Sequence, residues 1–247
     1  MGGGHKPNRR GHNTAVVGEA TREQILDAAE RLFAEQGPEA VSIRAIAAEA
    51  KVNLGAVNYH FVSKDRLFEA LFKRLVVPIN EQRLELLEQY IAAAGAGSHP
   101  RLEDILDAFV RPPLRLIGEA SGSARAIVVM QFLSHSFSKP GESGFLEAYY
   151  EPVRTRFISL LRKVLPGLAL EDVLWRYNYM VGCIIYAMGG PGRMTRLPKG
   201  LETEQAPRAN SNDAIEQLVA FAAAGLRAPS CVGKQPPLSE PRSRKRA

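Results

Sequence analysis

Side chains suited to hydrogen bonding with nucleic acid are concentrated between residues 42 and 64. Asn and Tyr can reach base edges or phosphates, and small residues let a helix approach the floor of the major groove. Arg44 can bind guanine through two parallel hydrogen bonds. The candidates for the helix that enters the groove are Asn53, Gly55, Ala56, Asn58 and Tyr59. The candidates for phosphate contacts are Ser42, Tyr59, His60 and Lys64, and for His60 packing at a helix end is an equally good interpretation.

The apolar residues of this segment are spaced as in two short helices separated by a tight turn. Positions 43, 46, 47 and 50 fall on one helical face, and residues 51–53 interrupt the pattern. Leu54 and Val57 then face inward in a second helix, which leaves its polar and small residues outside. The pattern predicts a helix-turn-helix and therefore DNA binding. The alternative is a pair of packed helices in an ordinary α-helical domain.

The flanking residues predict a helix on each side of this pair. Upstream, residues 21–24 (TREQ) have the pattern of a capping box, an apolar stripe follows, and Gly37-Pro38 ends the helix. Downstream, Ser63 is a candidate N-cap for a helix that begins at Lys64. A three-helix unit followed by a longer helix is the expected arrangement.

The segment from about Thr21 to Phe72 resembles the DNA-binding domain of the TetR family of bacterial repressors. The matching runs are ILDAAERLFAEQG, VSIRAIAAEAKVNLGAVNYHF and SKDRLFEALF. The resemblance implies an all-α fold, with an N-terminal three-helix DNA-binding domain and a C-terminal helical ligand-binding and dimerisation domain. It also places Arg44 at a position used for groove or phosphate contacts. One departure is Asn58, where the family often has Tyr, so which group contacts phosphate and which contacts a base stays open.

Composition is consistent with an intracellular DNA-binding protein. The 247 residues are 45% hydrophobic and carry a formal charge of +6, which fits a polyanionic partner without identifying one. Cys183 and Cys231 lie far apart with no metal-ligand spacing, so we expect neither a metal nor a cofactor. No catalytic motif predicts an enzyme, and no leader or spanning segment is expected. The expected location is the bacterial cytoplasm, on the nucleoid.

The remaining sequence predicts helices throughout. We expect a disordered tail over 1–18, the DNA-binding domain over 19–66, a helical effector-binding and dimerisation domain over 67–227, and a disordered basic tail over 228–247. Within the second domain, helices are predicted over 79–94, after Pro78, and over 101–117, where Pro112-Pro113 should break or kink the helix. A central apolar helix over 123–137, a long pair over 144–165 and 170–188, and a last helix over 213–226 complete the prediction.

The resemblance implies two tasks for the helical second domain. One is homodimerisation on a palindromic operator, through the helices over 145–165 and 170–188, with possible help from the last helix. The other is release from DNA by a hydrophobic small molecule. The candidate pocket residues, most of which could equally be core, are Phe109, Met130, Phe132, Leu133, His135, Phe137, Tyr149, Trp175 and Tyr179. Candidate polar anchors are His135, Arg115 and Arg176.

The nature of the effector stays open in the sequence. The AVNYHF run, residues 136–138, residues 149–153 and the Trp175-Arg176 region resemble a TetR subgroup that responds to fatty acids or their CoA esters. An aromatic drug or another hydrophobic metabolite would suit an apolar pocket equally well. Two other hypotheses are a DNA-binding architectural or activating factor without a ligand, and an enzyme that uses His135 or Tyr149 as acid or base.

Overall fold

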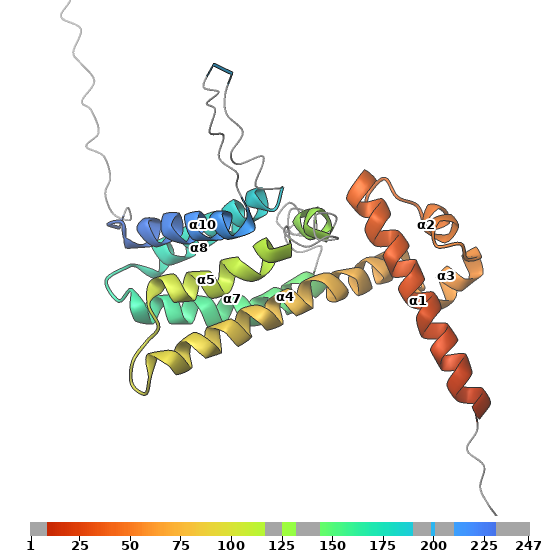
Figure 1. Ribbon diagram of the computed structural model, residues 1–247, viewed down its shortest axis with the longest axis horizontal. Helices are drawn as coiled ribbons and strands as arrows, with labels where there is room; N and C mark the ends of the chain where they lie inside the picture. The colour runs from red at the N-terminus through yellow and green to blue at the C-terminus, as the bar shows by residue number, and fades with distance from the viewer. Residues whose placement is uncertain (1–8, 117–124, 132–143, 190–198, 201–209, 231–247) are drawn as a thin grey trace, which may run out of the picture.

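Helices make up the regular structure of the described residues and form two connected units (Figure 1). The structure is a computed structural model, and it describes residues 9–116, 125–131, 144–189, 199–200 and 210–230. No β-strand occurs in those ranges, which confirms the expected all-α fold there. None of the helices in the same ranges is long and apolar enough to cross a membrane.

The first unit consists of α1 (Arg9–Gln36), α2 (Ile43–Glu49) and α3 (Leu54–His60). Its core joins Ile25 and Phe33 of α1 to Ile46 of α2 and Val57 of α3, all of them fully buried. The capping box predicted at residues 21–24 is wrong, because α1 begins at Arg9. Thr21 lies inside the helix, where its hydroxyl donates to the carbonyl oxygen of Val17 at 3.0 Å, as Thr side chains in helix interiors commonly do.

The long helix α4 (Lys64–Ala94) joins the two units (Figure 1). Its start at Lys64 confirms the prediction, and Ser63 is its N-cap. The separate helix predicted to begin after Pro78 is wrong, because α4 continues through that proline. Proline removes one intrahelical hydrogen bond, but packing on both sides of this position keeps the helix together: Leu75 and Ile79 are buried. The expected domain boundary at residue 66 therefore falls within a continuous helix.

The second unit contains α5 (Leu102–Arg115), a helical segment over 125–131, α7 (Gly144–Val164), α8 (Leu170–Ala187) and α10 (Ser211–Arg227). α5 packs between α4 and α10, and α7 and α8 pack beside it. The expected break at Pro112-Pro113 does not occur before Arg115. Both prolines are buried near the C-terminal end of α5, so few later turns depend on the hydrogen bonds that they remove.

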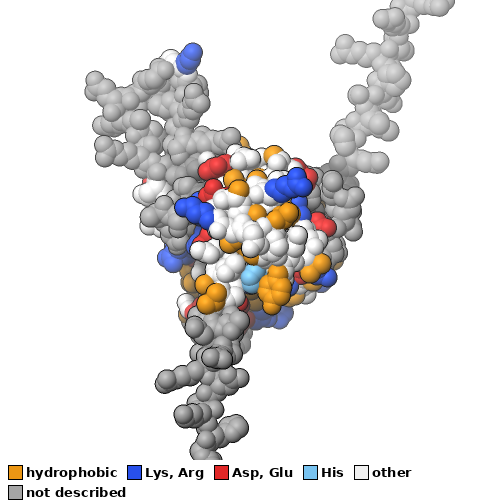
Figure 2. All heavy atoms as spheres, turned by 90° about the vertical axis from the view of Figure 1, so that its right-hand side faces the viewer, with side chains coloured by type: hydrophobic (Ala, Val, Ile, Leu, Met, Phe, Trp, Pro, Cys, Tyr) orange, Lys and Arg blue, Asp and Glu red, His pale blue; other side chains and the backbone are white. Residues whose placement is uncertain are grey.

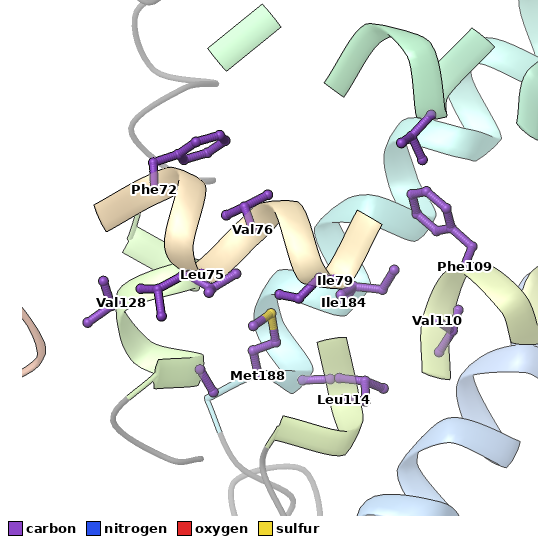
Figure 3. Close-up of a cluster of buried hydrophobic side chains, with 14 of the residues drawn as sticks. Phe72, Leu75, Val76, Ile79, Phe109, Val110, Leu114, Val128, Ile184 and Met188 are labelled. Carbon is purple, nitrogen blue, oxygen red and sulfur yellow. The ribbon is translucent and has the colours of Figure 1, made fainter. Parts of the chain in front are cut away.

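Buried apolar side chains of α4, α5, α8 and the 125–131 segment form a cluster in the second unit (Figure 3). Phe72, Leu75, Val76 and Ile79 of α4 line one side of it. The labelled residues that face them are Phe109, Val110, Leu114, Val128, Ile184 and Met188. The central helix predicted over 123–137 is described for residues 125–131 only.

Candidate DNA interface

Three side chains fix the starts of the helices in and after the helix-turn-helix. The Ser42 hydroxyl oxygen accepts from the Ala45 amide at 3.1 Å, and the Asn53 side-chain oxygen accepts from the Ala56 amide at 2.7 Å. Ser63 does the same for α4, at 3.2 Å. Each cap satisfies an amide that the first turn of a helix would otherwise leave unpaired. Ser42 and Asn53 were predicted to contact DNA, and each keeps one donor group free to do so.

The turn between α2 and α3 depends on an unusual backbone conformation at Lys51. Lys51 has φ of 56°, the left-handed region that a residue with a Cβ seldom adopts. Its amide donates to the carbonyl of Ala48 at 3.1 Å, and the next amide, of Val52, donates to the carbonyl of Ala47 at 3.0 Å. These bonds end α2 in the manner of a C-terminal cap, so Lys51 determines the direction in which α3 begins.

The outer face of α3 is open to solvent. Asn58 is exposed, and Tyr59 is 83% exposed. Val57 is fully buried as predicted, whereas Leu54 is 39% exposed because it occupies the first position of α3, at the edge of the unit. Gly55 lies close to the cap, since a Cβ there would stand 3.2 Å from the side-chain oxygen of Asn53. Ala56, the remaining candidate on α3, is half-buried and donates the capping hydrogen bond.

Basic and polar groups surround this face. Arg44 of α2 is exposed and has no ionic partner among the described residues. Lys64 is half-buried, and its ammonium group donates to the carbonyl of Glu39 at 3.4 Å. Figure 2 views the molecule from the side of the three-helix unit and shows Lys and Arg side chains together with a His beside an apolar group. The surface therefore offers cationic and hydrogen-bonding groups of the kind that contact phosphate.

His60 lies between solvent and core. Its ring is half-buried, at 5.2 Å edge-to-face from the ring of Tyr59 and 6.4 Å from that of Phe61. Phe61 is core, 3% exposed, with the Arg22 guanidinium over its ring at 5.5 Å. The geometry is consistent with both interpretations of His60, because the ring packs at the end of α3 and still reaches the surface.

A cluster of charges connects the three-helix unit to the second unit. The Arg125 Nε donates to Glu30 at 2.9 Å, although the two residues are far apart in sequence. Arg74 of α4 lies 3.6 Å from Glu30 and also pairs with Asp27. Glu30 is only 8% exposed, so this contact is screened less than a surface ion pair. Movement of the 125–131 segment would therefore act directly on α1.

The predicted pocket residues do not all lie in one place. Phe109 is buried, and Met130 and Tyr149 are partly buried against the core. Trp175 and Tyr179 lie on the outside of α8, 56% and 63% exposed, with their rings 5.8 Å apart. Phe132, Leu133, His135 and Phe137 lie outside the described residues.

Of the candidate polar anchors, Arg115 and Arg176 lie in the described residues, and neither offers an unpaired side chain to the interior. Arg115 is exposed. Arg176 donates to the carbonyls of Gly225, Leu226, Ala228 and Pro229, and so it caps the C-terminal end of α10. The buried cation that sequence reasoning missed is Arg83 of α4, 6% exposed. The sequence signal for its burial is its spacing. Arg83 lies four residues after Ile79 and four before Leu87, so it shares a helical face with two buried aliphatic residues.

Comparison with known families places both units in one group. Residues 25–71 match the family described as "Bacterial regulatory proteins, tetR family", and residues 107–225 match "Tetracyclin repressor-like, C-terminal domain". The first match contains every candidate DNA-contacting residue, and the second begins within α5 and ends within α10.

Individual relatives reach their highest identity over short stretches of the chain. A helix-turn-helix transcriptional repressor of Mycobacterium tuberculosis is 57% identical over 51 residues, which are 21% of this chain and 27% of the relative. The match thus spans about a quarter of that relative's length. The regulator UidR of Escherichia coli is 27% identical over 147 residues, 60% of this chain and 67% of the relative.

Solved structures share the fold over most of the chain at low identity. The ketosteroid transcriptional regulator KstR2 of Mycobacterium tuberculosis superposes with a TM-score of 0.54 at 17% identity, over 83% of this chain and 93% of that one. A putative tetR family regulator from Shewanella gives 0.54 at 19% identity, over 82% and 97%. At these identities the likeness concerns the fold alone.

Proposed function

The chain belongs to the TetR family of bacterial transcriptional regulators, and from that premise we propose that it is a ligand-responsive repressor. It binds a palindromic operator as a homodimer, acts on the nucleoid in the bacterial cytoplasm, and leaves DNA when a hydrophobic small molecule binds. The observation that carries this proposal is the exposed face of α3, presented by a buried core and by capped helix starts.

The face of α3 supports contacts of two kinds. Asn58 and Tyr59 are exposed on α3. Because neither belongs to the core, both can contact DNA without disturbing the packing of the unit. Arg44 approaches from α2 as a cation that no described carboxylate pairs with, suited to a guanine or a phosphate. Ser42 and Lys64 lie at the starts of α2 and α4, where contacts with the DNA backbone would fix the position of α3 in the groove.

Dimerisation is supported by exposed aromatic residues on the outer helices. Positions 175, 179, 182 and 186 fall on one face of α8, and Trp175, Tyr179 and Tyr186 there are more than half exposed. Phe221 of α10 is 68% exposed. Large aromatic side chains gathered at the surface favour an interface over open solvent. We therefore assign these residues to the contact between two copies, in place of the pocket role expected for Trp175 and Tyr179.

We place the effector site in the second unit. Of the candidate pocket residues, Phe109, Met130 and Tyr149 are described there and belong to the core or pack against it. A fatty acid or its CoA ester is the first class to test, because aliphatic and aromatic groups dominate the cluster in Figure 3. For release, the effector must favour a conformation in which the two α3 helices no longer match the operator.

The proposal is tested by selecting duplex DNA from a random library with the full chain, in the presence and absence of a long-chain acyl-CoA and of the free acid. We expect one enriched palindrome, lost in Arg44→Ala and in Tyr59→Ala but retained in the control Arg156→Ala, whose side chain pairs with Glu88 in the second unit. Circular dichroism and the size of the particle should be unchanged in all three variants. Enrichment that survives both substitutions on the first unit would refute the assigned face.

A further inference from the structure

Arg83 is a buried cation held by neutral groups. Its Nε donates to the carbonyl of Phe109 at 2.9 Å, and its Nη1 donates to the side-chain oxygen of Asn80 at 3.0 Å. Its guanidinium lies 4.0 Å from the centre of the Phe109 ring. No carboxylate among the described residues pairs with it. Burial lowers the pKa of Arg83, and the groups that act in the opposite direction are the phenols of Tyr177 and Tyr150, with no carboxylate among them.

A buried charge without a counter-ion is costly. Burying an ionised group is strongly unfavourable unless an opposite charge and hydrogen bonds compensate for the lost hydration. The two hydrogen bonds and the ring contact offset part of this cost, but a guanidinium carries more N–H donors than they use. The interior therefore holds a positive charge, and some N–H donors of the Arg83 guanidinium are not used by these two hydrogen bonds.

The structural need at this position does not require a charge. Pro113 lies four residues after Phe109 in α5 and has no amide hydrogen, so the Phe109 carbonyl lacks its helical donor. Arg83 supplies that donor. A neutral amide could supply the same hydrogen bond, so satisfaction of Phe109 explains a donor at this position and leaves the charge unexplained.

Phenol groups from two other helices lie in the same region. The hydroxyl of Tyr150 on α7 is buried and has no hydrogen-bond partner within the described part of the chain, and the ring packs 5.6 Å from that of Phe72. The Tyr177 ring on α8 lies 5.2 Å from that of Phe109. Burial raises the pKa of Tyr150, and that of Tyr177 to about 12, while the charge of Arg83 acts against both increases. Both phenols are therefore protonated donors near a cation.

Apolar surface adjoins these polar groups. Ile79 lies one helical turn before Arg83 on α4 and belongs to the cluster in Figure 3. Phe72 and Phe109, which contact Tyr150 and Arg83, are members of that cluster as well. A cation and an unpaired hydroxyl thus border a surface made of aliphatic and aromatic side chains.

We propose that Arg83 and Tyr150 bind the carboxylate of an amphipathic organic acid, whose apolar part packs in the cluster of Figure 3. The acid supplies the missing counter-ion, and the Tyr150 hydroxyl donates to its second oxygen. This inference rests on the proposed function only in treating the acid as the effector. It selects a free acid over its CoA ester, because the thioester has no charge at the position facing Arg83.

The test compares matched compounds by direct binding to the full chain, without DNA. The probes are straight-chain acids from octanoate to hexadecanoate and 2-naphthoate, each paired with the alcohol of the same skeleton, with palmitoyl-CoA as the ester. Isothermal titration calorimetry should show that at least one acid binds tenfold or more tightly than its alcohol, the range of about 10- to 100-fold expected for a hydrogen bond to a charged group. An acid series that binds no better than the alcohols, or not at all, overturns the proposal.

The variants separate the charge from the structural donor. Arg83→Gln retains a donor for the Phe109 carbonyl and should abolish the preference for acid over alcohol, whereas Arg83→Lys should retain part of it. Without ligand, Arg83→Gln should melt at the same temperature as the parent or higher, because it removes an uncompensated buried charge. A Gln variant that still prefers the acid overturns the proposal, and the acid–alcohol comparison on the parent decides the question if the variant does not fold.

The two proposals can fail separately. An acid that binds through Arg83 without releasing operator DNA refutes the effector role and leaves the site standing. A compound that releases operator DNA equally from the parent and from Arg83→Gln supports the repressor function and refutes this site.

Discussion

The backbone of the helix-turn-helix turn is open to a test that separates conformation from charge. Lys51 is exposed and has φ of 56°, so replacing it removes no core contact. A left-handed conformation costs a residue with a Cβ about 1–2 kcal/mol, and glycine avoids that cost. Glycine also loses more conformational freedom on folding, and this entropy loss lowers stability by about 0.4–1 kcal/mol. The net expectation for Lys51→Gly is a gain of about 0.5–1 kcal/mol.

Thermal unfolding measures this gain against a matched control. Lys51→Ala loses the same charge but keeps the Cβ, so it should remain strained. A difference of ~1 kcal/mol corresponds to roughly 2–4 °C in Tm for a chain of this size. Lys51→Gly should therefore melt above Lys51→Ala by about that interval, at equal salt concentration. An alanine variant as stable as the glycine variant would refute the idea that the turn is strained at this residue.

Operator binding supplies the second half of the comparison. Both variants lose one cation near the proposed DNA surface, so both should weaken binding to the same extent. If Lys51 neutralises a phosphate, the slope of log K against log salt falls by about 0.9 in each. Equal affinities with unequal stabilities would show that the turn keeps its direction when the strain is removed.

Three further predictions concern single contacts. Gly55→Ala should lower stability by up to about 1 kcal/mol and weaken operator binding, because its Cβ would crowd the α3 cap at 3.2 Å; an unchanged Tm contradicts this. The pKa of Glu103 is lowered from 4.5, chiefly by the hydrogen bond from Arg227, so this pair stabilises the fold above pH 4.5 and loses that effect as pH falls through the folded-state pKa. Glu103→Gln should accordingly flatten the decline of Tm below pH 4.5, and a parallel decline would count against it. Glu30→Gln, which weakens the contact with Arg125, should reduce the effect of effector on operator affinity by about 0.5–2 kcal/mol while unliganded affinity changes little, and full retention of the effect would exclude this route.

The sequence predicted the first unit better than the second for a physical reason. Short-range rules were sufficient at Ser63, where a hydroxyl meets a helix start, and at Val57, where periodicity identifies the buried face. The same rules misled at Thr21, because a capping pattern inside a longer helix has no unpaired amide to satisfy. The rule that helices start after proline also fails at Pro78, because packing of neighbouring turns keeps α4 continuous.

In the second unit, residue type alone could not separate core, interface and site. Trp175 and Tyr179 are as apolar as buried residues but lie on the outside of α8, and only the arrangement of the helices reveals this. Arg83 poses the opposite problem, since a cation is expected at the surface and its burial depends on α5, α7 and α8 closing around it. The roles of the candidate DNA-contacting residues stay predictions.

The continuity of α4 makes it a lever between the two units. Its rise of about 1.5 Å per residue puts Arg83 roughly 28 Å from Lys64, where α4 meets the three-helix unit. A tilt of about 5° over that length displaces the Lys64 end of α4, next to the three-helix unit, by about 2.5 Å, which is comparable to the full length of a hydrogen bond. Pro78 lies between Arg83 and Lys64 and lacks one backbone hydrogen bond. The stiffness of the helix at Pro78 would therefore determine how much of a tilt at Arg83 reaches Lys64. A compliant joint there would absorb the rotation, and a stiff one would pass it undiminished to the groove.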